Sequence, residues 1–212
     1  MDNPQFADPT PKRRERSDAR ENRRQLLAVA KQLFNTQGID RTSMHEIGRT
    51  AGVGQATLYR HFADKGEICH ALIKEDLAAF QERVGALIDS AGAATSPLAR
   101  LETLIIEKNR LTESHLPLFA AIDEAATSVQ HKAFRGPFHM WLHAQITSLF
   151  AQAVAQGEVA PLDAAFAADA ILAAVAPHLY RYQRQDLGYS SERIMAAMRH
   201  LFIDGLRQGN TV

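Results

Sequence analysis

Apolar residues along this chain recur at intervals of three and four, the spacing that places them on one face of an α-helix. The first such stretch runs from about Ser17 to Gly38, where the glycine is suited to a C-terminal cap. Its apolar face consists of Leu26, Leu27, Ala30, Leu33 and Phe34. Strand-like alternation does not stand out elsewhere, so the pattern predicts an all-α fold.

Residues 42–65 predict two short helices joined by a tight turn. Ser43 is a favourable N-cap residue, and Glu46 three positions later completes the capping-box pattern. Gly52 ends this helix, because glycine readily adopts the positive φ of a turn. The second helix begins at Gln55 or at the residue before it. Its apolar side consists of Leu58, Tyr59 and Phe62.

A long helix follows from Asp64 and continues for about six turns, enough to join a small head to a larger body. Its apolar face consists of Ile68, Leu72, Ile73, Leu77, Phe80, Val84 and Leu87. Further helices are predicted at residues 97–113, 116–127, 137–156, 163–184 and 191–208. Pro177 lies inside the fourth of these, and we expect it to kink that helix.

The pattern divides the chain into three parts. Residues 1–16, in which three prolines are mixed with charge, are expected to be a disordered basic arm. The basic side chains of this arm either contact DNA or form a solvated tail. Residues 17–63 form a three-helix head, and residues 64–212 form a helical body, with about nine helices in the whole chain.

The net charge over 212 residues is zero, but the charge is unevenly distributed. Residues 1–65 hold 12 lysines and arginines against 8 acidic residues, whereas residues 66–212 hold 12 against 16. A basic N-terminal part on a neutral protein indicates a local anionic partner. Chance scatter is the alternative, and it is weakened because seven basic residues fall between Lys12 and Arg24.

Cysteine content and hydropathy indicate the cellular compartment in which the protein is expected. Cys69 is the single cysteine, so an intrachain disulfide is excluded. The N-terminus lacks the apolar core of a signal peptide. No apolar run approaches the ~18 residues that a membrane span requires. We therefore expect a cytoplasmic protein without a membrane partner.

The two short helices meet the requirements of a helix-turn-helix, in which the second helix enters the DNA major groove. Gln55 and Thr57 lie near the start of this second helix. A glutamine can pair with adenine through two hydrogen bonds, and a threonine methyl group can pack on thymine. Phosphate contacts are expected from Tyr59, Arg60, His61 and Lys65. The alternative is that these are ordinary exposed polar side chains.

The run TSMHEIGRTAGVGQATLYRHFADK, together with the basic arm, resembles the tetracycline-repressor (TetR) family of bacterial transcription regulators over roughly residues 17–80. The resemblance implies a DNA-binding head on a ligand-binding and dimerising body. It also implies that DNA is met by Thr42, Ser43, His45, Gln55, Ala56, Thr57, Tyr59, His61 and Lys65. Two glycines depart from the family pattern. Gly48 replaces a frequent alanine and is expected to loosen its helix by up to ~1 kcal/mol, and Gly54 replaces a frequent serine cap at about a few tenths of a kcal/mol.

The last two predicted helices are candidates for a dimer interface. Helix 163–184 carries eight alanines between Ala164 and Ala176. One face of helix 191–208 presents Ile194, Met198, Leu201 and Gly205. The family resemblance implies that these two helices form a four-helix homodimer bundle, and the alternative is core within one chain. A twofold dimer would match a palindromic operator with half-sites roughly 34–36 Å apart.

Aromatic residues and histidines concentrate in the middle helices, and an apolar cavity with a few polar groups is what a small-molecule effector requires. Our candidates for this site are Phe119, Phe138, Trp141, His143, His178 and Tyr182. Hydrophobic core is the alternative for any one aromatic. His139 lies four residues from His143, but zinc needs further ligands and no third stands out, so we predict neither a metal nor a cofactor.

Together these inferences predict a homodimeric repressor of bacterial transcription that acts on the nucleoid and is released from its operator by a small molecule. Ligand binding would move the long helix after residue 64 and change the spacing of the two recognition helices. One alternative is an activator or chromosome-organising protein of the same fold without a ligand. An enzyme is disfavoured, because the sequence shows no nucleophile–base pair, phosphate loop or metal quartet.

Overall fold

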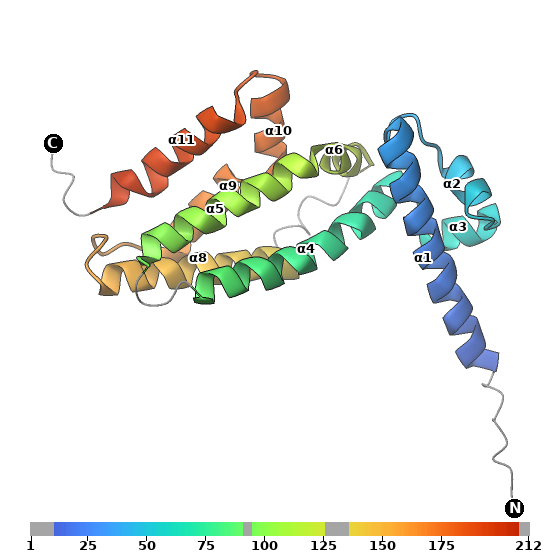
Figure 1. Ribbon diagram of the computed structural model, residues 1–212, viewed down its shortest axis with the longest axis horizontal. Coiled ribbons are helices and arrows are strands. Elements are labelled where there is room, and N and C mark those ends of the chain that lie inside the picture. Colours follow the sequence, from blue (N-terminus) through green and yellow to red (C-terminus); the bar gives the residue numbers. More distant parts are fainter. Residues whose placement is uncertain (1–10, 91–94, 126–135, 208–212) are drawn as a thin grey trace, which may run out of the picture. The chain divides into compact units, whose positions relative to one another are not determined.

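The computed structural model describes residues 11–90, 95–125 and 136–207, and Figure 1 labels the helices in these ranges. Over these ranges the regular structure is helical, and the sole β-type pairing is an isolated bridge between Val159 and Arg207. The all-α prediction is confirmed. No helix in these ranges combines the length and the apolarity needed to cross a membrane.

The chain divides into two compact units, residues 1–72 and residues 73–212, which we call the head and the body. The helix α4 (Lys65–Ser90) is continuous across the boundary. About two turns of α4 belong to the head, and the remainder belongs to the body.

The head contains α1 (Pro11–Gln37), α2 (Met44–Thr50), α3 (Gln55–His61) and the start of α4. Each of the four helices contributes a fully buried side chain to its core: Leu26, Ile47, Leu58 and Ile68. Helices as short as α2 and α3 are marginal in isolation. Their stability therefore comes from this shared apolar core.

The helix α1 begins at Pro11, whereas we expected disorder through residue 16 and a helix from Ser17. Proline is tolerated in the first turn, and the lysines, arginines and glutamates that follow have high helix propensity, so the helix extends toward the N-terminus. At its other end Gly38 has a φ of 88° and donates its N–H to the Phe34 carbonyl at 3.0 Å. The predicted glycine cap is confirmed. The first ten residues of the expected arm lie outside the described part of the chain.

The predicted start of α2 and the turn after it are both present. The Ser43 hydroxyl accepts the backbone N–H of Glu46 at 3.1 Å, so Ser43 is the N-cap. Gly52 has a φ of 64°, as the turn requires. The Glu46 carboxylate accepts a hydrogen bond from the Gln37 amide at 2.9 Å, so it connects α2 to the end of α1.

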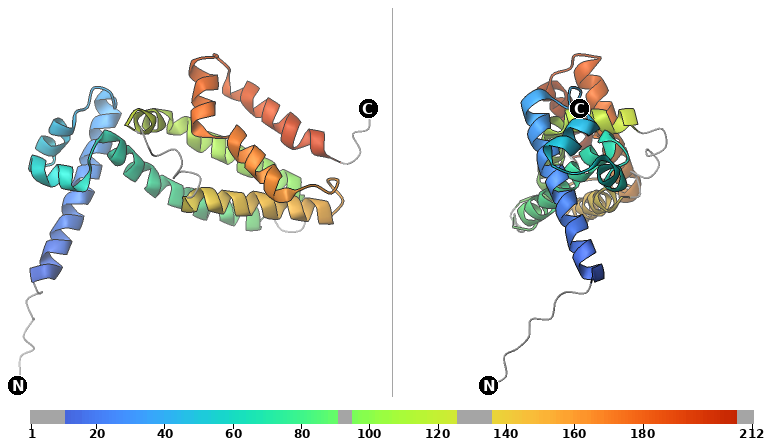
Figure 2. Two further views of the ribbon diagram at one scale, coloured as in Figure 1. Left: turned by 180° about the vertical axis from the view of Figure 1, so that it is seen from behind. Right: turned by 90° about the vertical axis from the view of Figure 1, so that its right-hand side faces the viewer.

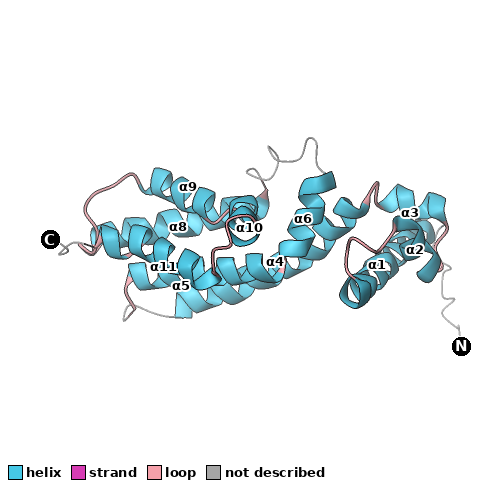
Figure 3. Cartoon of the chain, turned by 90° about the horizontal axis from the view of Figure 1, so that it is seen from above, coloured by secondary structure: helices cyan, strands magenta, loops and turns pink. Residues whose placement is uncertain are grey.

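In the body, α5 (Pro97–Ser114) and α8 (Pro137–Ala155) pack against each other, and α9 (Ala164–Ala174) packs along α8, as Figure 2 shows from behind. The other elements are α6 (Leu116–Ala125), α10 (Pro177–Gln185), α11 (Ser191–Phe202) and the 3₁₀ helix η1 (Asp204–Leu206), seen from above in Figure 3. Fully buried residues such as Leu101, Ile146, Phe150, Ile171 and Tyr180 form a single core.

The helix predicted at residues 163–184 is two helices in the structure. The first ends at Ala174, and the second begins at Pro177. Proline has no N–H and its ring clashes with the preceding turn, so the helix breaks where we expected only a kink. The last predicted helix, 191–208, is also shorter, because α11 ends at Phe202 and a 3₁₀ turn follows.

Candidate DNA interface and the interior of the body

The helices α2 and α3 approach each other closely at Gly48. A Cβ atom at this position would lie 2.8 Å from Gln55 Nε2 and 3.2 Å from the Val53 carbonyl oxygen. From helix propensity we expected Gly48 only to loosen α2. The structure gives it a further role, because the absence of a side chain lets α3 pack on α2. The orientation of α3 within the head therefore depends on a glycine here.

The two faces of α3 differ sharply in burial. Leu58 is fully buried, and Phe62 just after the helix is also buried. Five of the side chains that we expected at DNA are exposed on or next to α2 and α3: Ser43, His45, Ala56, Tyr59 and Arg60. Gln55 and Thr57 are half-buried. Gln55 and Thr57 are in the first turn of α3, the end from which a recognition helix reads base edges.

Gln55 is held in place before any DNA is present. Its Nε2 donates to the His45 carbonyl at 3.3 Å. A glutamine amide has two hydrogens and one acceptor oxygen, so Oε1 and the second hydrogen remain for a base. The side chain is thus oriented by α2 while it keeps both groups that adenine recognition requires.

Thr42 is 2% exposed, which corrects its expected role at DNA. Its hydroxyl donates to the Gly38 carbonyl at 2.8 Å and accepts from the Gln37 amide at 3.2 Å. The loop between α1 and α2 folds back onto the end of α1 and takes this side chain inside. Thr42 therefore positions α2 and does not offer its hydroxyl to a phosphate.

Lys65 is also engaged within the head. Its Nζ donates to the carbonyl oxygens of Ile39 at 2.7 Å and Thr42 at 3.3 Å. We expected this ammonium group on a DNA phosphate, and the structure instead places it on the loop that precedes α2. Lys65 thereby connects the first turn of α4 to the α1–α2 loop, and the expected phosphate contact has no support in this conformation.

His61 is half-buried at the end of α3. Burial lowers its pKa, and the neighbouring charges of Arg60 and Arg23 lower it further. Its Nε2 is buried without a hydrogen-bond partner among the described residues. The Arg23 guanidinium lies 4.9 Å from the centroid of the Phe62 ring. The lowered pKa favours the neutral form of His61, which can still donate or accept a hydrogen bond at DNA.

The aromatic residues that we expected at an effector site serve mainly to pack helices. Trp141 and Phe138 stack on α8 with ring centroids 6.2 Å apart. Both rings also meet the buried Phe80 of α4 edge-on, at 6.2 and 5.6 Å. Trp141 is thus part of the contact between α8 and α4, and our choice of it as a pocket wall is not supported.

The other candidates for the effector site are dispersed. Phe119 is half-buried, whereas His178 and Tyr182 on α10 are exposed. His143 lies 3.4 Å from the Asp169 carboxylate, a contact between α8 and α9. Within the described ranges, no group of three histidine, cysteine or acidic side chains is arranged to hold a metal ion. Cys69 is buried in the head, and burial raises the pKa of its thiol to about 11, which makes it unreactive.

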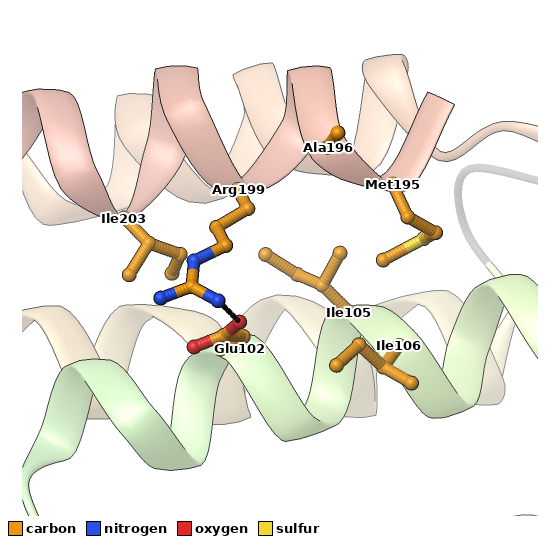
Figure 4. A pocket seen from close by; sticks show the side chains of 7 residues that line it. All are labelled: Glu102, Ile105, Ile106, Met195, Ala196, Arg199 and Ile203. Atoms are coloured by element: carbon orange, nitrogen blue, oxygen red, sulfur yellow. Dashed lines mark ion pairs between the residues drawn. The ribbon is translucent and has the colours of Figure 1, made fainter. Parts of the chain in front are cut away.

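A groove of about 260 Å³ lies elsewhere, between α5 and α11. Figure 4 shows its mostly apolar lining, with an ion pair at one end where Arg199 Nη1 lies 3.5 Å from Glu102 Oε1. The lining residues are Glu102, Ile105, Ile106, Met195, Ala196, Arg199 and Ile203. None of them was among the sequence candidates, because the groove arises from the packing of two distant segments.

Sequence reasoning also missed a buried polar cluster on α5. Lys108, Asn109 and Thr112 are the buried polar side chains among the described residues of the body. A signal for them was present, since Leu101, Leu104, Lys108 and Thr112 continue one buried stripe at helical spacing. A lysine at a core position of an amphipathic helix is a departure from the expected pattern.

The short helix α2, the glycine turn and the surface-exposed α3 define a helix-turn-helix protein. In agreement, residues 26–72 match the family model described as bacterial regulatory proteins, tetR family. Over these residues the head is therefore similar to this family. An HTH-type transcriptional regulator of Staphylococcus aureus (strain USA300) is 43% identical over 65 residues, which cover 31% of this chain and 35% of that protein. The match thus spans about a third of the length of these curated relatives.

Solved structures extend the likeness to the whole fold. A regulator of the TetR/AcrR family from Thermobifida fusca is 23% identical with a TM-score of 0.65, over 89% of this chain and all of that one. A TetR-family regulator from Pectobacterium atrosepticum is 24% identical with a TM-score of 0.62, over 91% and 97%. AibR in complex with isovaleryl coenzyme A and operator DNA is 23% identical with a TM-score of 0.58, over 86% and 98%. These similarities support the fold of head and body alike.

Proposed function

We propose that this protein is a dimeric transcription regulator that binds a palindromic DNA operator through α3. The observation that carries this proposal is the arrangement of α3, whose inner face is fixed in the head core at Leu58 while Tyr59 and Arg60 are exposed. Gln55 and Thr57 are half-buried in its first turn. A helix anchored in this way can enter a major groove with its readers at the N-terminal end.

The dimer would form through α9, α10 and α11. Each of these helices exposes a large apolar side chain: Phe166 is 72% exposed, Tyr182 50% and Leu201 62%. In the proposed dimer the partner subunit would cover these three side chains. A twofold dimer would place two copies of α3 roughly 34–36 Å apart, or a multiple of that distance, along the DNA.

The regulator would act as a repressor in the cytoplasm and leave its operator when a small molecule binds the body. AibR, which shares the fold, is described as a complex with isovaleryl coenzyme A and with operator DNA. The continuous helix α4 provides a physical connection from the body to the head. The effector must bind the DNA-free conformation more tightly than the bound one, since only differential affinity shifts the equilibrium.

Selection of bound fragments from a random DNA pool tests the function class. We expect an inverted repeat, with half-sites spaced by one helical turn or more, and a protein dimer in sedimentation. Enrichment of sequences without twofold symmetry, or a monomer at micromolar concentration, would overturn the dimeric operator. Transcription from a reporter that carries the selected site then separates a repressor from an activator or a chromosome-organising protein.

A further inference from the structure

The middle of α5 contains a charged side chain where the fold should hold an apolar one. Lys108 is 6% exposed. Its Nζ donates to the Thr112 hydroxyl at 2.7 Å and to the Val175 carbonyl at 3.3 Å. Both partners are neutral, so the two hydrogen bonds satisfy two of the three ammonium donors and do not cancel the charge.

No carboxylate among the described residues lies within ion-pair distance of Lys108. The two acids closest to it along α5 are bound to arginines. Glu107 contacts Arg83 and Arg110, each at 2.6 Å, and Glu113 contacts Arg184 at 2.8 Å. Removing a cation from water without an opposite charge is strongly unfavourable, so a buried lysine is normally paired.

The residue next to Lys108 is also incompletely hydrogen-bonded. The neighbouring Asn109 amide donates to the thioether of Met195 at 2.8 Å, which is a weak acceptor, and its buried Oδ1 has no partner among the described residues. Met195 lines the groove between α5 and α11. Asn109 therefore lies beside the groove through its contact with Met195, whereas Lys108 and Thr112 are not among the lining residues. His139 on α8 lies close enough to Lys108 to interact with it electrostatically.

The Val175 carbonyl belongs to the break between α9 and α10. Val175 is the C-cap residue of α9, and Pro177 two positions later has no N–H to donate. Lys108 supplies a hydrogen bond at this carbonyl and a positive charge at the negative end of α9. The same ammonium group thus holds the α9–α10 junction in its present form.

We propose that Lys108, positioned by the Thr112 hydroxyl, receives the carboxylate of an apolar monocarboxylic acid, and that this acid is the effector of the regulator. The proposal rests on the function proposed above. One ammonium group matches a single negative charge, whereas a phosphate group would leave about one further charge buried. The apolar remainder of the acid would lie against the surrounding core and the groove.

Binding of the acid has a defined consequence for the body. A carboxylate is a stronger partner for the ammonium group than a neutral carbonyl, so Lys108 would exchange Val175 for the ligand. The junction between α9 and α10 would then lose the side chain that holds it. Since both helices lie in the proposed dimer interface, the effector would act on the arrangement of the two subunits.

The test is a direct binding measurement on the full-length protein without DNA. The probes are saturated straight-chain monocarboxylates of about four to ten carbons, a size suited to a small pocket, and the primary amides of the same chains. Titration calorimetry and thermal unfolding are recorded for each. We expect at least one acid to bind and to raise the unfolding temperature, and its amide, which has the same shape and no charge, not to do so.

Lys108→Met should weaken binding of the active acid roughly 10- to 100-fold, the usual effect of losing a hydrogen bond to a charged partner. Lys74→Met is the matched control, because Lys74 is exposed on α4 and the substitution is the same. Thr112→Val removes one hydroxyl and keeps the volume, so a smaller loss is expected. It also provides a second variant if Lys108→Met does not fold.

Three results would overturn the proposal: none of the acids binds, the amides bind as well as the acids, or Lys108→Met and Thr112→Val bind like the wild type. Stronger binding of alkyl phosphates than of the acids would also contradict it. Failure of the operator proposal is a separate outcome, because it appears as a lack of DNA selection and leaves these DNA-free titrations unaffected.

Discussion

The head and the body of this protein treat their interior polar groups in opposite ways. In the head, the buried Thr42 hydroxyl both donates and accepts, and Lys65 covers two loop carbonyls. In the body, Lys108 is buried without an opposite charge and the Asn109 oxygen has no partner among the described residues. The head has one such atom too, His61 Nε2 at the end of α3, but among its described residues it holds no buried charge of this kind. A buried charge without an opposite charge is strongly unfavourable, so this difference directs the search for a ligand to the body.

The largest expected effect is the unfolding of the head, but not of the body, by one core substitution. Leu58→Ala removes a fully buried side chain of α3 and should cost the head about 2–5 kcal/mol of unfolding free energy. DNA binding should be lost while the body stays folded. Amide hydrogen exchange, resolved by peptide, measures both units in one experiment. Equal loss of protection in the two units would show that they are not independent.

The readers on α3 are tested by base specificity. Gln55→Ala and Thr57→Ala should each relax the preference at particular operator positions by about 1–3 kcal/mol. Competition between single-base operator variants measures the change. Lys31→Met, an exposed change on α1, should leave the pattern of preferences unaltered. A uniform loss of affinity for all DNA in the Gln55 and Thr57 variants would argue against base readout.

The uncompensated charge in the body predicts a pH effect on stability. Burial lowers the pKa of Lys108 to about 8, well below its value in the unfolded chain. Between these two values the unfolded state holds one more proton than the folded state, so the wild type should gain stability as pH rises above 8. The gain is at most about 1.4 kcal/mol per pH unit.

Other groups also titrate in this pH range. Their contribution cancels when the unfolding free energy of the wild type is compared with that of Lys108→Met at each pH. Urea unfolding at pH 7, 8 and 9 should show the wild type approaching or passing the variant as pH increases. His139 on α8 lies close enough to interact electrostatically with Lys108, but burial lowers its pKa and it remains neutral over this range. A constant difference between the two proteins would place the Lys108 pKa outside this interval.

The smallest expected effect is the loss of operator affinity on substitution of Lys65. Lys65→Met removes the hydrogen bonds to Ile39 and Thr42 and should weaken operator binding by about 1 kcal/mol through the position of α2. The salt dependence of binding should be unchanged. If Lys65 instead contacts a phosphate in the complex, the slope of log affinity against log salt should fall by about one. The same measurement therefore distinguishes a positioning residue from a phosphate clamp.

Local sequence patterns anticipated much of the head. The serine cap of α2, the positive φ of Gly52 and the start of α3 at Gln55 depend on neighbours within a few residues, and each was predicted. The predictions that were not supported concern residues whose contacts are made with distant segments of the chain. Lys65 lies 26 residues from the Ile39 carbonyl that it binds, and Trp141 meets Phe80 of another helix. Helical periodicity identifies which face of a helix is buried. It does not identify the residues of other segments that pack against this face.

The sequence by itself determined the helical class, the caps, the glycine turn and the family of the head, since these follow from side-chain chemistry and spacing along one helix. Only the tertiary structure decided which polar side chains are inside. Thr42 and Lys65 became positioning groups because a loop folds back on α1. Lys108 on α5 is a buried cation whose hydrogen-bond partner, the Val175 carbonyl at the α9–α10 break, lies 67 residues further along the chain. Burial of charge is a property of packing, and a helical pattern alone does not specify its partner.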